Sequence, residues 1–317
     1  MGNIVDYVRT CRNTFEATPL NRVDSLVFAW LAFLRIPEES PEACAPEGAT
    51  IAQIATQIDS LSLTAAAHDP ARSEDLLLAC ATSPRYSGVR ACLAVDEWSR
   101  KRECQFSAVT FLLPQGAQGS VVAFRGTDNT LVGWKECFNM AFSATVPAQV
   151  SAREYLEHVA QHVAGPLFVT GHSKGGNLAT FAAMTCADGV RARIERCYSH
   201  DGPGFSEEIV TDPRWMANTN MVERIVPEES LVGMLLSNSG TEPLVVCSTN
   251  PGIMQHSPFS WVVEGDDFAY ALSITYDSYR MGKRMNSWLA SMAPTDRERV
   301  VEILYKLVQA TGETTTS

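Results

Sequence analysis

Residues 166–188 read Pro-Leu-Phe-Val-Thr-Gly-His-Ser-Lys-Gly-Gly-Asn-Leu-Ala-Thr-Phe-Ala-Ala-Met-Thr-Cys-Ala-Asp. The apolar run at 167–169 predicts a buried parallel strand, and apolar side chains at helical spacing further along predict a helix. Between them, residues 171–175 have the pattern G-x-S-x-G. Both glycines are needed because a Cβ at either position would collide with the neighbouring strand or helix. The stretch therefore predicts a sharp strand-to-helix turn that exposes the hydroxyl of Ser173, a candidate nucleophile.

A second glycine-containing turn, Phe124-Arg125-Gly126-Thr127, follows another predicted strand. A serine nucleophile works with an oxyanion hole, built from one amide after the serine and one from an earlier strand-to-helix loop. The amide of Lys174 lies at the predicted helix N-terminus and can supply the first. Gly126 and Thr127 can supply the second, with the Thr127 hydroxyl as an extra donor. We expect Arg125 to hold this turn through a carboxylate rather than to touch substrate.

A serine also needs a base, which is itself held by an acid. Among the six histidines, His256 follows the last predicted strand, on the kind of loop that carries the base of an α/β-hydrolase. His200 ends an earlier strand and is the alternative base. We expect His172 to pack against the sheet. The remaining histidines are expected in a loop or on a helix surface: His68, His158 and His162.

The acid has two candidate positions. Asp201 directly follows a predicted strand, and the glycine-proline turn after it would hold its carboxylate at the sheet edge. A pair of glutamates follows the next strand, of which Glu229 is the alternative acid. Asp266 and Asp267 lie after His256, which is the wrong chain order for this fold. We therefore predict a triad of Ser173, His256 and Asp201.

The composition is that of a large globular protein, with 317 residues of which 45% are hydrophobic and 19% charged. The net charge of −11, without any Lys/Arg run, argues against nucleic acid or an anionic membrane as a partner. The longest apolar run, residues 26–34, is too short to span a bilayer. Nine scattered cysteines and no signal-peptide pattern lead us to expect reduced thiols and a cytoplasmic location. No Cys/His pairing has metal-ligand spacing, and no cofactor is implied.

The chain divides into three expected regions. Residues 1–104 form a helical region packed on the core, with small and polar residues at 60–72 as a candidate lid. Residues 105–275 alternate strand and helix, which predicts a mainly parallel sheet flanked by helices, the α/β-hydrolase fold. Residues 276–317 supply C-terminal helices and a short disordered tail. The predicted helices are 3–15, 24–35, 50–58, 74–81, 149–163, 176–187, 276–290 and 295–311. The predicted strands are 106–113, 120–124, 167–169, 195–200, 222–226 and 244–247.

At these motifs the chain resembles the class 3 (fungal-type) lipases. The turn at 124–127 and the motif at 171–176 carry this resemblance. The chain is more closely similar to a bacterial lipase-like family of α/β-hydrolases, a domain of unknown function, over roughly residues 1–265. That similarity rests on the combination of residues 3–7, 133–136, 201–205, 225–227, 230–233, 255–256 and 260–261. The resemblance implies the fold and a serine hydrolase apparatus, and names no substrate.

Three departures from the class 3 pattern matter. Ser230 stands where those lipases carry the triad aspartate, so the acid must lie elsewhere, which favours Asp201. Cys137 replaces an aspartate common in this family, which would weaken the partner of Arg125. Lys174 stands where leucine is usual, and its charge near the pocket would favour an anionic group on the substrate.

Together these features predict a carboxylesterase or lipase-like serine hydrolase that cleaves an acyl ester through an acyl-enzyme. The expected partner is a small-molecule acyl ester, with lipid esters included. Thioesterase, amidase or acyltransferase chemistry would use the same apparatus. The alternative outside the enzymes is a non-catalytic binding module on the same fold. In that case the absence of an aspartate at position 230 would indicate that catalytic activity has been lost.

Overall fold

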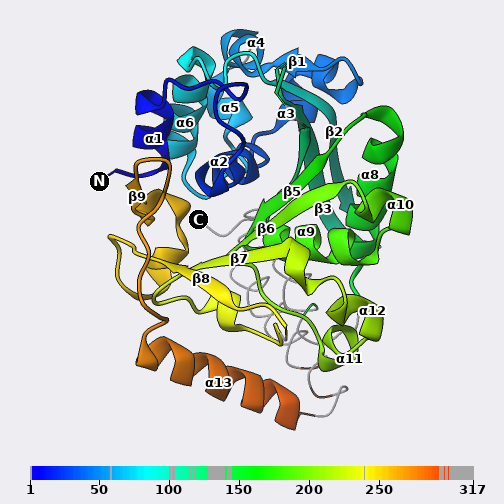
Figure 1. Ribbon diagram of the computed structural model, residues 1–317, viewed down its shortest axis with the longest axis vertical. Coiled ribbons are helices and arrows are strands. Elements are labelled where there is room, and N and C mark those ends of the chain that lie inside the picture. The colour runs from blue at the N-terminus through cyan, green and yellow to red at the C-terminus, as the bar shows by residue number, and fades with distance from the viewer. Residues whose placement is uncertain are drawn as a thin grey trace.

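An eight-stranded sheet, in which β1 to β8 follow one another in sequence order, forms the centre of the protein (Figure 1). The computed structural model describes residues 2–57, 59–99, 101, 104–114, 116–117, 119–127, 140, 145–238, 240–292, 296 and 299. The strands of this sheet are β1 (Ala49–Thr50), β2 (Arg90–Ser99), β3 (Cys104–Leu112), β4 (Ser120–Phe124), β5 (Leu167–His172), β6 (Ile194–His200), β7 (Val222–Pro227) and β8 (Pro243–Val246). Two short strands, β9 (Val263–Glu264) and β10 (Asp267–Phe268), form a separate pair.

Helices lie between and around these strands. The α-helices are α1 (Ile4–Thr10), α2 (Arg22–Leu31), α3 (Ile36–Glu39), α4 (Ile51–Gln57), α5 (Ser60–Leu63), α6 (Pro70–Thr82), α8 (Pro147–His162), α9 (Lys174–Thr185), α10 (Asp188–Arg191), α11 (Glu207–Val210), α12 (Pro213–Met216) and α13 (Tyr276–Ser291). The 3-10 helices are η1 (Pro41–Cys44), η2 (Thr219–Met221), η3 (Val232–Met234), η4 (Gly252–His256) and η5 (Pro258–Ser260).

The two halves of the sheet differ in strand direction. Strands β1 to β4 pair antiparallel, whereas β4 to β8 pair parallel. Parallel neighbours need crossover connections, and α8 and α9 supply them on either side of β5. The predicted α/β-hydrolase fold, with its mainly parallel sheet and flanking helices, is confirmed. In such sheets, residues at the carboxyl ends of neighbouring strands meet at one edge, which is where a site forms.

Alternation along β4 sends its side chains to two different cores. Val121 and Ala123 pack with the N-terminal helices α1, α2 and α6. Val122 and Phe124 pack with α8 and α9. Helices therefore cover both faces of the sheet, and Figure 1 shows α1, α2 and α6 grouped on one side of it.

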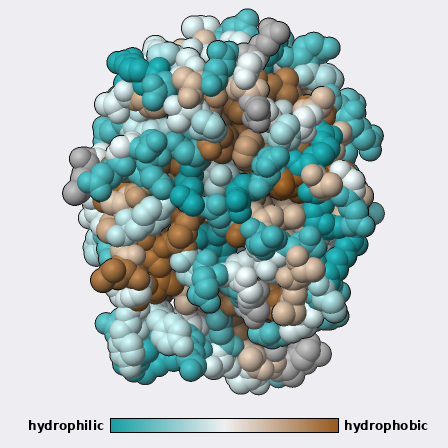
Figure 2. All heavy atoms as spheres, in the orientation of Figure 1, coloured by the Kyte–Doolittle hydropathy of each residue, from teal (hydrophilic) through white to brown (hydrophobic). Residues whose placement is uncertain are grey.

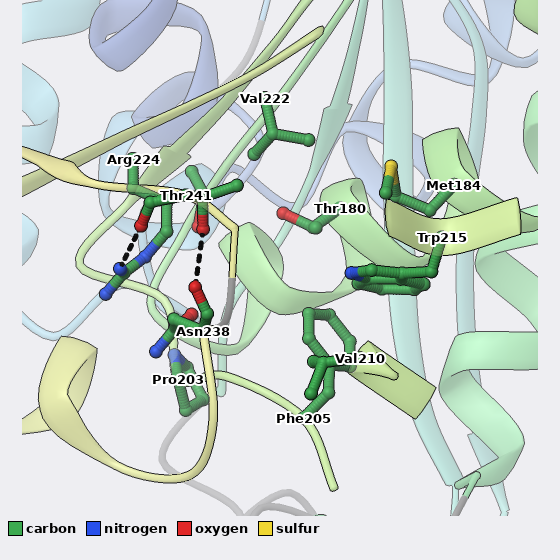
Figure 3. Close-up of a pocket in the computed structure, with 11 residues that line it drawn as sticks. Thr180, Met184, Pro203, Phe205, Val210, Trp215, Val222, Arg224, Asn238 and Thr241 are labelled. Carbon is green, nitrogen blue, oxygen red and sulfur yellow. Dashed lines mark hydrogen bonds between the residues drawn. The ribbon is translucent and has the colours of Figure 1, made fainter. Parts of the chain in front are cut away.

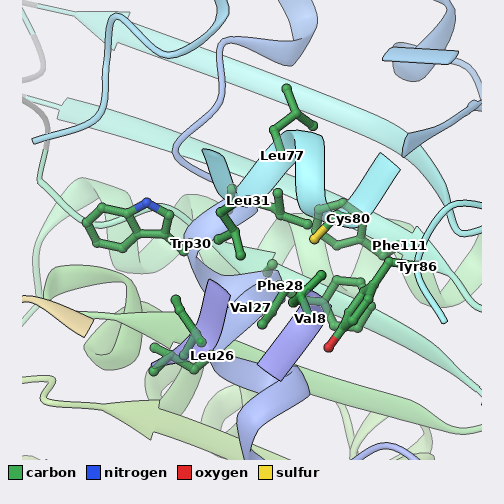
Figure 4. Close-up of a cluster of buried hydrophobic side chains, with 14 of the residues drawn as sticks. Val8, Leu26, Val27, Phe28, Trp30, Leu31, Leu77, Cys80, Tyr86 and Phe111 are labelled. Carbon is green, nitrogen blue, oxygen red and sulfur yellow. The ribbon is translucent and has the colours of Figure 1, made fainter. Parts of the chain in front are cut away.

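Helix α2 is buried on almost every side, as its uniformly apolar sequence predicts. Every residue from 23 to 31 is buried, and Asn21 caps the helix by a reciprocal hydrogen-bonded capping box with its third residue. Figure 4 shows Phe28 among side chains from several elements; its ring centroid lies 4.9 Å from that of Phe111 and 5.7 Å from that of Tyr86. The N-terminal helices thus share one core with the sheet.

A buried carboxylate anchors this core, and we call its surroundings the Asp24 cluster (Asp24, Arg85, Tyr7 and Tyr86). The Arg85 guanidinium donates to both carboxylate oxygens of Asp24, at 2.8 and 2.5 Å, and both side chains are fully buried. The hydroxyls of Tyr7 and Tyr86 donate to Oδ1 at 3.0 and 2.5 Å. Burial and the Asp24 charge raise the pKa values of both tyrosines, so both remain donors. The cluster ties α1, α2 and the segment after α6 together.

Strand β2 was not predicted, since residues 1–104 were expected to be helical. It pairs antiparallel with β3, with a register shift between Cys92 and Val95. Leu93, inside this irregularity, has φ +51°. Such a bulge breaks the alternation of apolar and polar residues, which hides the strand from a periodicity argument. The division of the chain at residues 104 and 275 remains a prediction.

The other expected elements divide into those present and those outside the described residues. The hairpin of β3 and β4 and the helix α13 are confirmed. The 60–72 stretch, the candidate lid, contains α5 and the start of α6. The predicted helix at 295–311, the motif at 133–136 and Cys137 lie outside the described residues. The cysteines that the structure describes form no disulfide.

The surface is mixed, with hydrophobic atoms in patches between hydrophilic ones (Figure 2). Over α13 it is mostly hydrophilic, consistent with Ser278 and Gly282 being the residues this helix buries. Within the described residues, no helix has the length and apolar content needed to cross a bilayer.

Candidate active site

The turn at Ser173 joins β5 to α9. Ser173 has φ +58° and ψ −130°, a strained conformation for an L-residue and one expected of a nucleophile elbow. A Cβ on Gly171 would lie 2.1 Å from the carbonyl oxygen of Gly175, and a Cβ on Gly175 would lie 2.2 Å from that of Phe124. Both positions therefore require glycine, and the sharp turn predicted from the motif is present.

His256 and Asp201 form a hydrogen-bonded pair near this turn. Nδ1 of His256 lies 2.6 Å from Oδ2 of Asp201. The Asp201 side chain is 1% exposed and that of His256 is 27% exposed. The ring centroid of His256 lies 4.6 Å from that of His172, the residue before Ser173. Because Nδ1 donates to the carboxylate, the neutral imidazole leaves its Nε2 as a proton acceptor.

The carboxylate of Asp201 is held by more than His256. Ser230 donates its hydroxyl to Oδ1 at 2.5 Å, and the Gly233 amide donates to the same atom at 3.1 Å. Asp201 itself has φ +48°, which aspartate tolerates better than most residues do. Ser230, which stands where the class 3 pattern has an aspartate, thus contacts the carboxylate that bonds the His256 ring. The departure at 230 was the only sequence signal for this contact.

Glu229, the alternative acid, contacts a different group. Its carboxylate accepts a hydrogen bond from the amide of Gly252, and its own amide donates to Oε1 of Gln255 at 2.8 Å. Both contacts support η4, the short helix that ends at His256. Asp201, rather than Glu229, is therefore the carboxylate bonded to the His256 ring.

The backbone of η4 is fixed by two further donors. Nε2 of His172 lies 2.8 Å from the carbonyl oxygen of His256, and Nε1 of Trp261 donates to the Gln255 carbonyl at 2.8 Å. His172 is buried and packs on Trp30 with ring centroids 5.5 Å apart, as its predicted packing role requires. Its additional contact with His256 was not foreseen, because nothing in the local sequence relates residues 172 and 256.

His200, the alternative base, faces away from this arrangement. It is fully buried, and its Nε2 lies 2.8 Å from Oγ of Ser25, whose own hydroxyl donates to the Arg22 carbonyl. Nε2 of His200 must therefore carry the proton. Burial lowers the pKa of His200 to about 3 and, with the nearby His256, lowers that of His172 well below the usual range. Both histidines are neutral at pH 7.

The residues predicted for the oxyanion hole surround the same turn. A Cβ placed on Gly126 would lie 3.4 Å from Cβ of Ser173. Thr127 is buried, and in the described part of the chain its Oγ1 has no hydrogen-bond partner. Lys174 is the first residue of α9, so its amide lies at the N-terminus of this helix. Buried donors of this kind suit an anionic ligand atom.

Arg125 holds the Gly126 turn through a carboxylate, as expected. Its Nη1 and Nη2 each lie 2.8 Å from one oxygen of Asp96 on β2. The Arg125 side chain is 3% exposed, so this bidentate pair is shielded from water. The pair fixes the turn to the antiparallel half of the sheet.

The predicted role of the Lys174 charge was wrong. Its side chain is fully buried, and Nζ donates to the carbonyl and Oε1 of Gln105 at 2.6 and 2.8 Å. Because α9 begins directly beneath the sheet, the first side chain of the helix points to β3 rather than to a substrate pocket. The ammonium therefore supports the sheet.

Ser173 is half-buried, and no described residue makes a hydrogen bond with its Oγ. Hydrogen bonds between a nucleophile and its base are often long or poorly aligned in the absence of substrate, and they tighten when substrate binds. The cavity in Figure 3 contains no candidate site residue: it lies between α9, β6 and β7, with Thr180, Phe205 and Arg224 among its walls. Its volume is about 10 Å³, enough for about one water molecule. No group of three His, Cys, Asp or Glu side chains suited to a metal ion occurs within the described ranges.

A sequence profile described as Mbeg1-like, a lipase-like family, matches residues 80–306. The chain belongs to the Mbeg1-like family. The matched range includes Ser173, Asp201 and His256. The lipase-like family expected from the motifs is thereby confirmed.

Solved structures similar to this chain include several fungal lipases. One crystal structure of a fungal lipase is 15% identical, with a TM-score of 0.46, covering 86% of this chain and 90% of that one. The mono- and diacylglycerol lipase from Aspergillus oryzae is 13% identical, with a TM-score of 0.44, covering 81% and 88%. No curated protein sequence matches this chain.

Proposed function

We propose that this protein is a serine hydrolase of carboxylic esters, with Ser173 as nucleophile, His256 as base and Asp201 as acid. The observation that carries the proposal is the 2.6 Å hydrogen bond between His256 and the buried carboxylate of Asp201, beside the strained turn of Ser173. A strained serine, a partly exposed imidazole and a buried carboxylate are the parts that nucleophilic ester cleavage uses.

The chemistry follows from the tautomer of His256. With Nδ1–H donated to Asp201, Nε2 accepts the Ser173 hydroxyl proton as Oγ forms a bond to the ester carbonyl carbon. The tetrahedral intermediate collapses when the bond to the leaving alkoxide breaks and His256 returns the proton to it. Water then attacks the carbonyl carbon of the acyl-enzyme and gives a proton to Nε2 of His256. The bond between that carbon and Oγ of Ser173 breaks, His256 returns the proton to Oγ, and the carboxylic acid is released.

In this proposal the amides of Thr127 and Lys174 stabilise the negative charge on the carbonyl oxygen. Because Gly126 has no side chain, the turn can lie close to Ser173. The Thr127 hydroxyl, which is buried and without a partner within the described residues, is an additional donor. One oxyanion donor contributes about 3–4 kcal/mol to transition-state stabilisation. Asp201 orients His256 and stabilises the imidazolium that forms.

The substrate we propose is an uncharged acyl ester, with lipid esters included, since the Lys174 ammonium is turned away from the site. The test is hydrolysis of p-nitrophenyl esters from acetate to palmitate by the wild-type protein and by Ser173→Ala. The variant is expected to fall to the background rate for every ester, with an unchanged melting temperature.

A matched control is Ser287→Ala on the exposed side of α13. It also replaces a serine by alanine, at a position far from Ser173 in the sequence. It should retain the wild-type rate. Full activity in Ser173→Ala would remove Ser173 as the nucleophile.

A further inference from the structure

A histidine of the N-terminal region contacts the Gly126 turn. His68 lies between α5 and α6, in the stretch expected as a mobile lid, and its Nε2 is 2.7 Å from the carbonyl oxygen of Thr127. A carbonyl can only accept, so Nε2 of His68 carries the proton and donates. The contact joins residues 59 positions apart in sequence. The contact thus connects a side chain of the N-terminal region to Thr127, a residue of the proposed oxyanion hole.

A second side chain of the same region supports the other half of the turn. A Cβ on Gly126 would lie 2.9 Å from Cζ of Phe33. The Phe33 ring also packs on His68 and on His172, with centroid separations of 6.1 and 6.4 Å. Phe33 and His68 therefore form one support: the ring contacts the turn at Gly126, and the imidazole bonds it at Thr127.

We propose that His68 is a positioning residue for the oxyanion hole, acting through the carbonyl of Thr127. This inference rests on the proposed function. His68 touches no reacting atom; it fixes the orientation of the Thr127 carbonyl group. With the Arg125–Asp96 pair fixing the residue before Gly126, the turn is held on both sides.

Fixing this carbonyl matters because an oxyanion donor must point to where charge develops before the reaction starts. The Thr127 amide and hydroxyl are set by the φ and ψ angles of the turn. Without the His68 bond, the Thr127 carbonyl would seek water, and the turn could rotate its donors away. Transition-state binding would weaken while ground-state binding of an uncharged ester would change little.

The N-terminal region would then be part of the catalytic machinery rather than a mobile cover. A lid at 60–72 would have to leave the site when it opens, and that would break the bond from His68 to Thr127. A positioning role instead requires the segment to stay in place, which agrees with α5 and α6 forming helices at its two ends.

The experiment compares two replacements of His68 with different donors. His68→Phe keeps a ring next to Phe33 and removes the donor, while His68→Gln keeps an N–H group of similar reach. We expect His68→Phe to lower kcat for a p-nitrophenyl ester by about 10-fold, less than loss of an oxyanion donor itself. KM should stay within about twofold, and His68→Gln should recover most of kcat.

The matched control is His158→Phe, the same replacement at an exposed histidine of α8. It should leave kcat and KM unchanged, and all three variants should keep the wild-type melting temperature because His68 and His158 are both exposed. Equal losses in His68→Phe and His68→Gln, or wild-type kcat in His68→Phe, would overturn the positioning role.

Failure of this inference is separable from failure of the proposed function. A wild-type protein that a fluorophosphonate does not label at Ser173 contradicts the hydrolase assignment itself. Labelling at Ser173 with the same rate constant in wild type and His68→Phe contradicts only the role of His68.

Discussion

Two buried aspartates stand in contrasting surroundings in this protein. Asp24 is fully buried and paired with Arg85, whose guanidinium bonds both carboxylate oxygens, while two tyrosine hydroxyls complete the cluster. Asp201 is as deeply buried, but its partners are Ser230, the Gly233 amide and the imidazole of His256. One carboxylate thus faces a permanent charge and the other faces a group that can gain and lose a proton.

The difference separates stability from chemistry. Arginine stays protonated at any physiological pH, so the Asp24 cluster has one charge state and serves to hold helices together. Histidine changes charge near neutral pH, so the Asp201 pair can take a proton and give it back. The surroundings of the two aspartates are connected, since His200 precedes Asp201 and its ring bonds Ser25, the residue after Asp24.

Asp201→Asn is expected to give the largest change in activity. An amide would favour the wrong tautomer of His256, which in a serine triad lowers kcat by about 10⁴. The melting temperature should change far less than kcat, because the amide keeps the shape of the carboxylate. Ester hydrolysis and thermal unfolding measured on one preparation check this. A variant that unfolds but retains kcat in its folded fraction would give Asp201 the structural role assigned to Asp24.

Asp24→Asn should show the reverse pattern. The replacement leaves the Arg85 guanidinium buried without its counter-charge, which typically costs about 3–5 kcal/mol. Urea unfolding should report this loss, while kcat per folded molecule remains at the wild-type value. If Asp24→Asn lost kcat about a thousandfold at unchanged stability, the assignment of a purely structural role to the Asp24 cluster would be contradicted.

Ser230→Ala should reduce activity by a smaller factor. It removes a hydrogen bond to a charged, buried carboxylate, worth about 1.5–3 kcal/mol, which corresponds to about 10- to 160-fold in kcat. Glu229→Gln is the matched control, because Glu229 supports η4 and does not bond the His256 ring; it should change kcat by little. Equal losses in both variants would return the acid assignment to Glu229.

Acid should destabilise the folded protein through His200, which precedes Asp201 in the chain and bonds Ser25, the residue after Asp24. The pKa of His200 is about 3 when folded and about 6.5 in an unfolded chain. Below pH 6.5 the unfolded chain therefore binds a proton that the folded protein does not bind until about pH 3. As the pH is lowered across this window, protonation of His200 in the unfolded chain reduces the free energy of unfolding by about 1.4 kcal/mol per pH unit. His200→Gln should flatten the slope by about one proton in urea unfolding from pH 7 to 4, and an unchanged slope would contradict the burial of His200.

Local sequence decides some of this structure. The turn at Ser173 could be predicted because its two glycines are required by atoms a few residues away or on the neighbouring strand. The pairing of His256 with Asp201 could be predicted because Asp201 directly follows a strand and because Ser230 replaces the expected aspartate. Strand and helix alternation predicted the mainly parallel sheet.

Other features depend on contacts that no local pattern encodes. Strand β2 was missed because the bulge at Leu93 interrupts its periodicity. The direction of the Lys174 side chain depends on how α9 packs beneath β3. The bond from His68 to Thr127 and the pairing of Asp24 with Arg85 each join residues about 60 positions apart.

The most direct measurement is the rate and site of fluorophosphonate labelling, because it needs no knowledge of the substrate. Wild-type protein and the Asp201→Asn and Asp24→Asn variants are labelled under native conditions, and the adduct is located by peptide mass. We expect the adduct on Ser173, formed in Asp24→Asn at the wild-type rate per folded molecule and in Asp201→Asn on the order of 100-fold or more slowly. Absence of an adduct on Ser173 in the wild type, or equal labelling rates in wild type and Asp201→Asn, would contradict activation of Ser173 by His256 and Asp201.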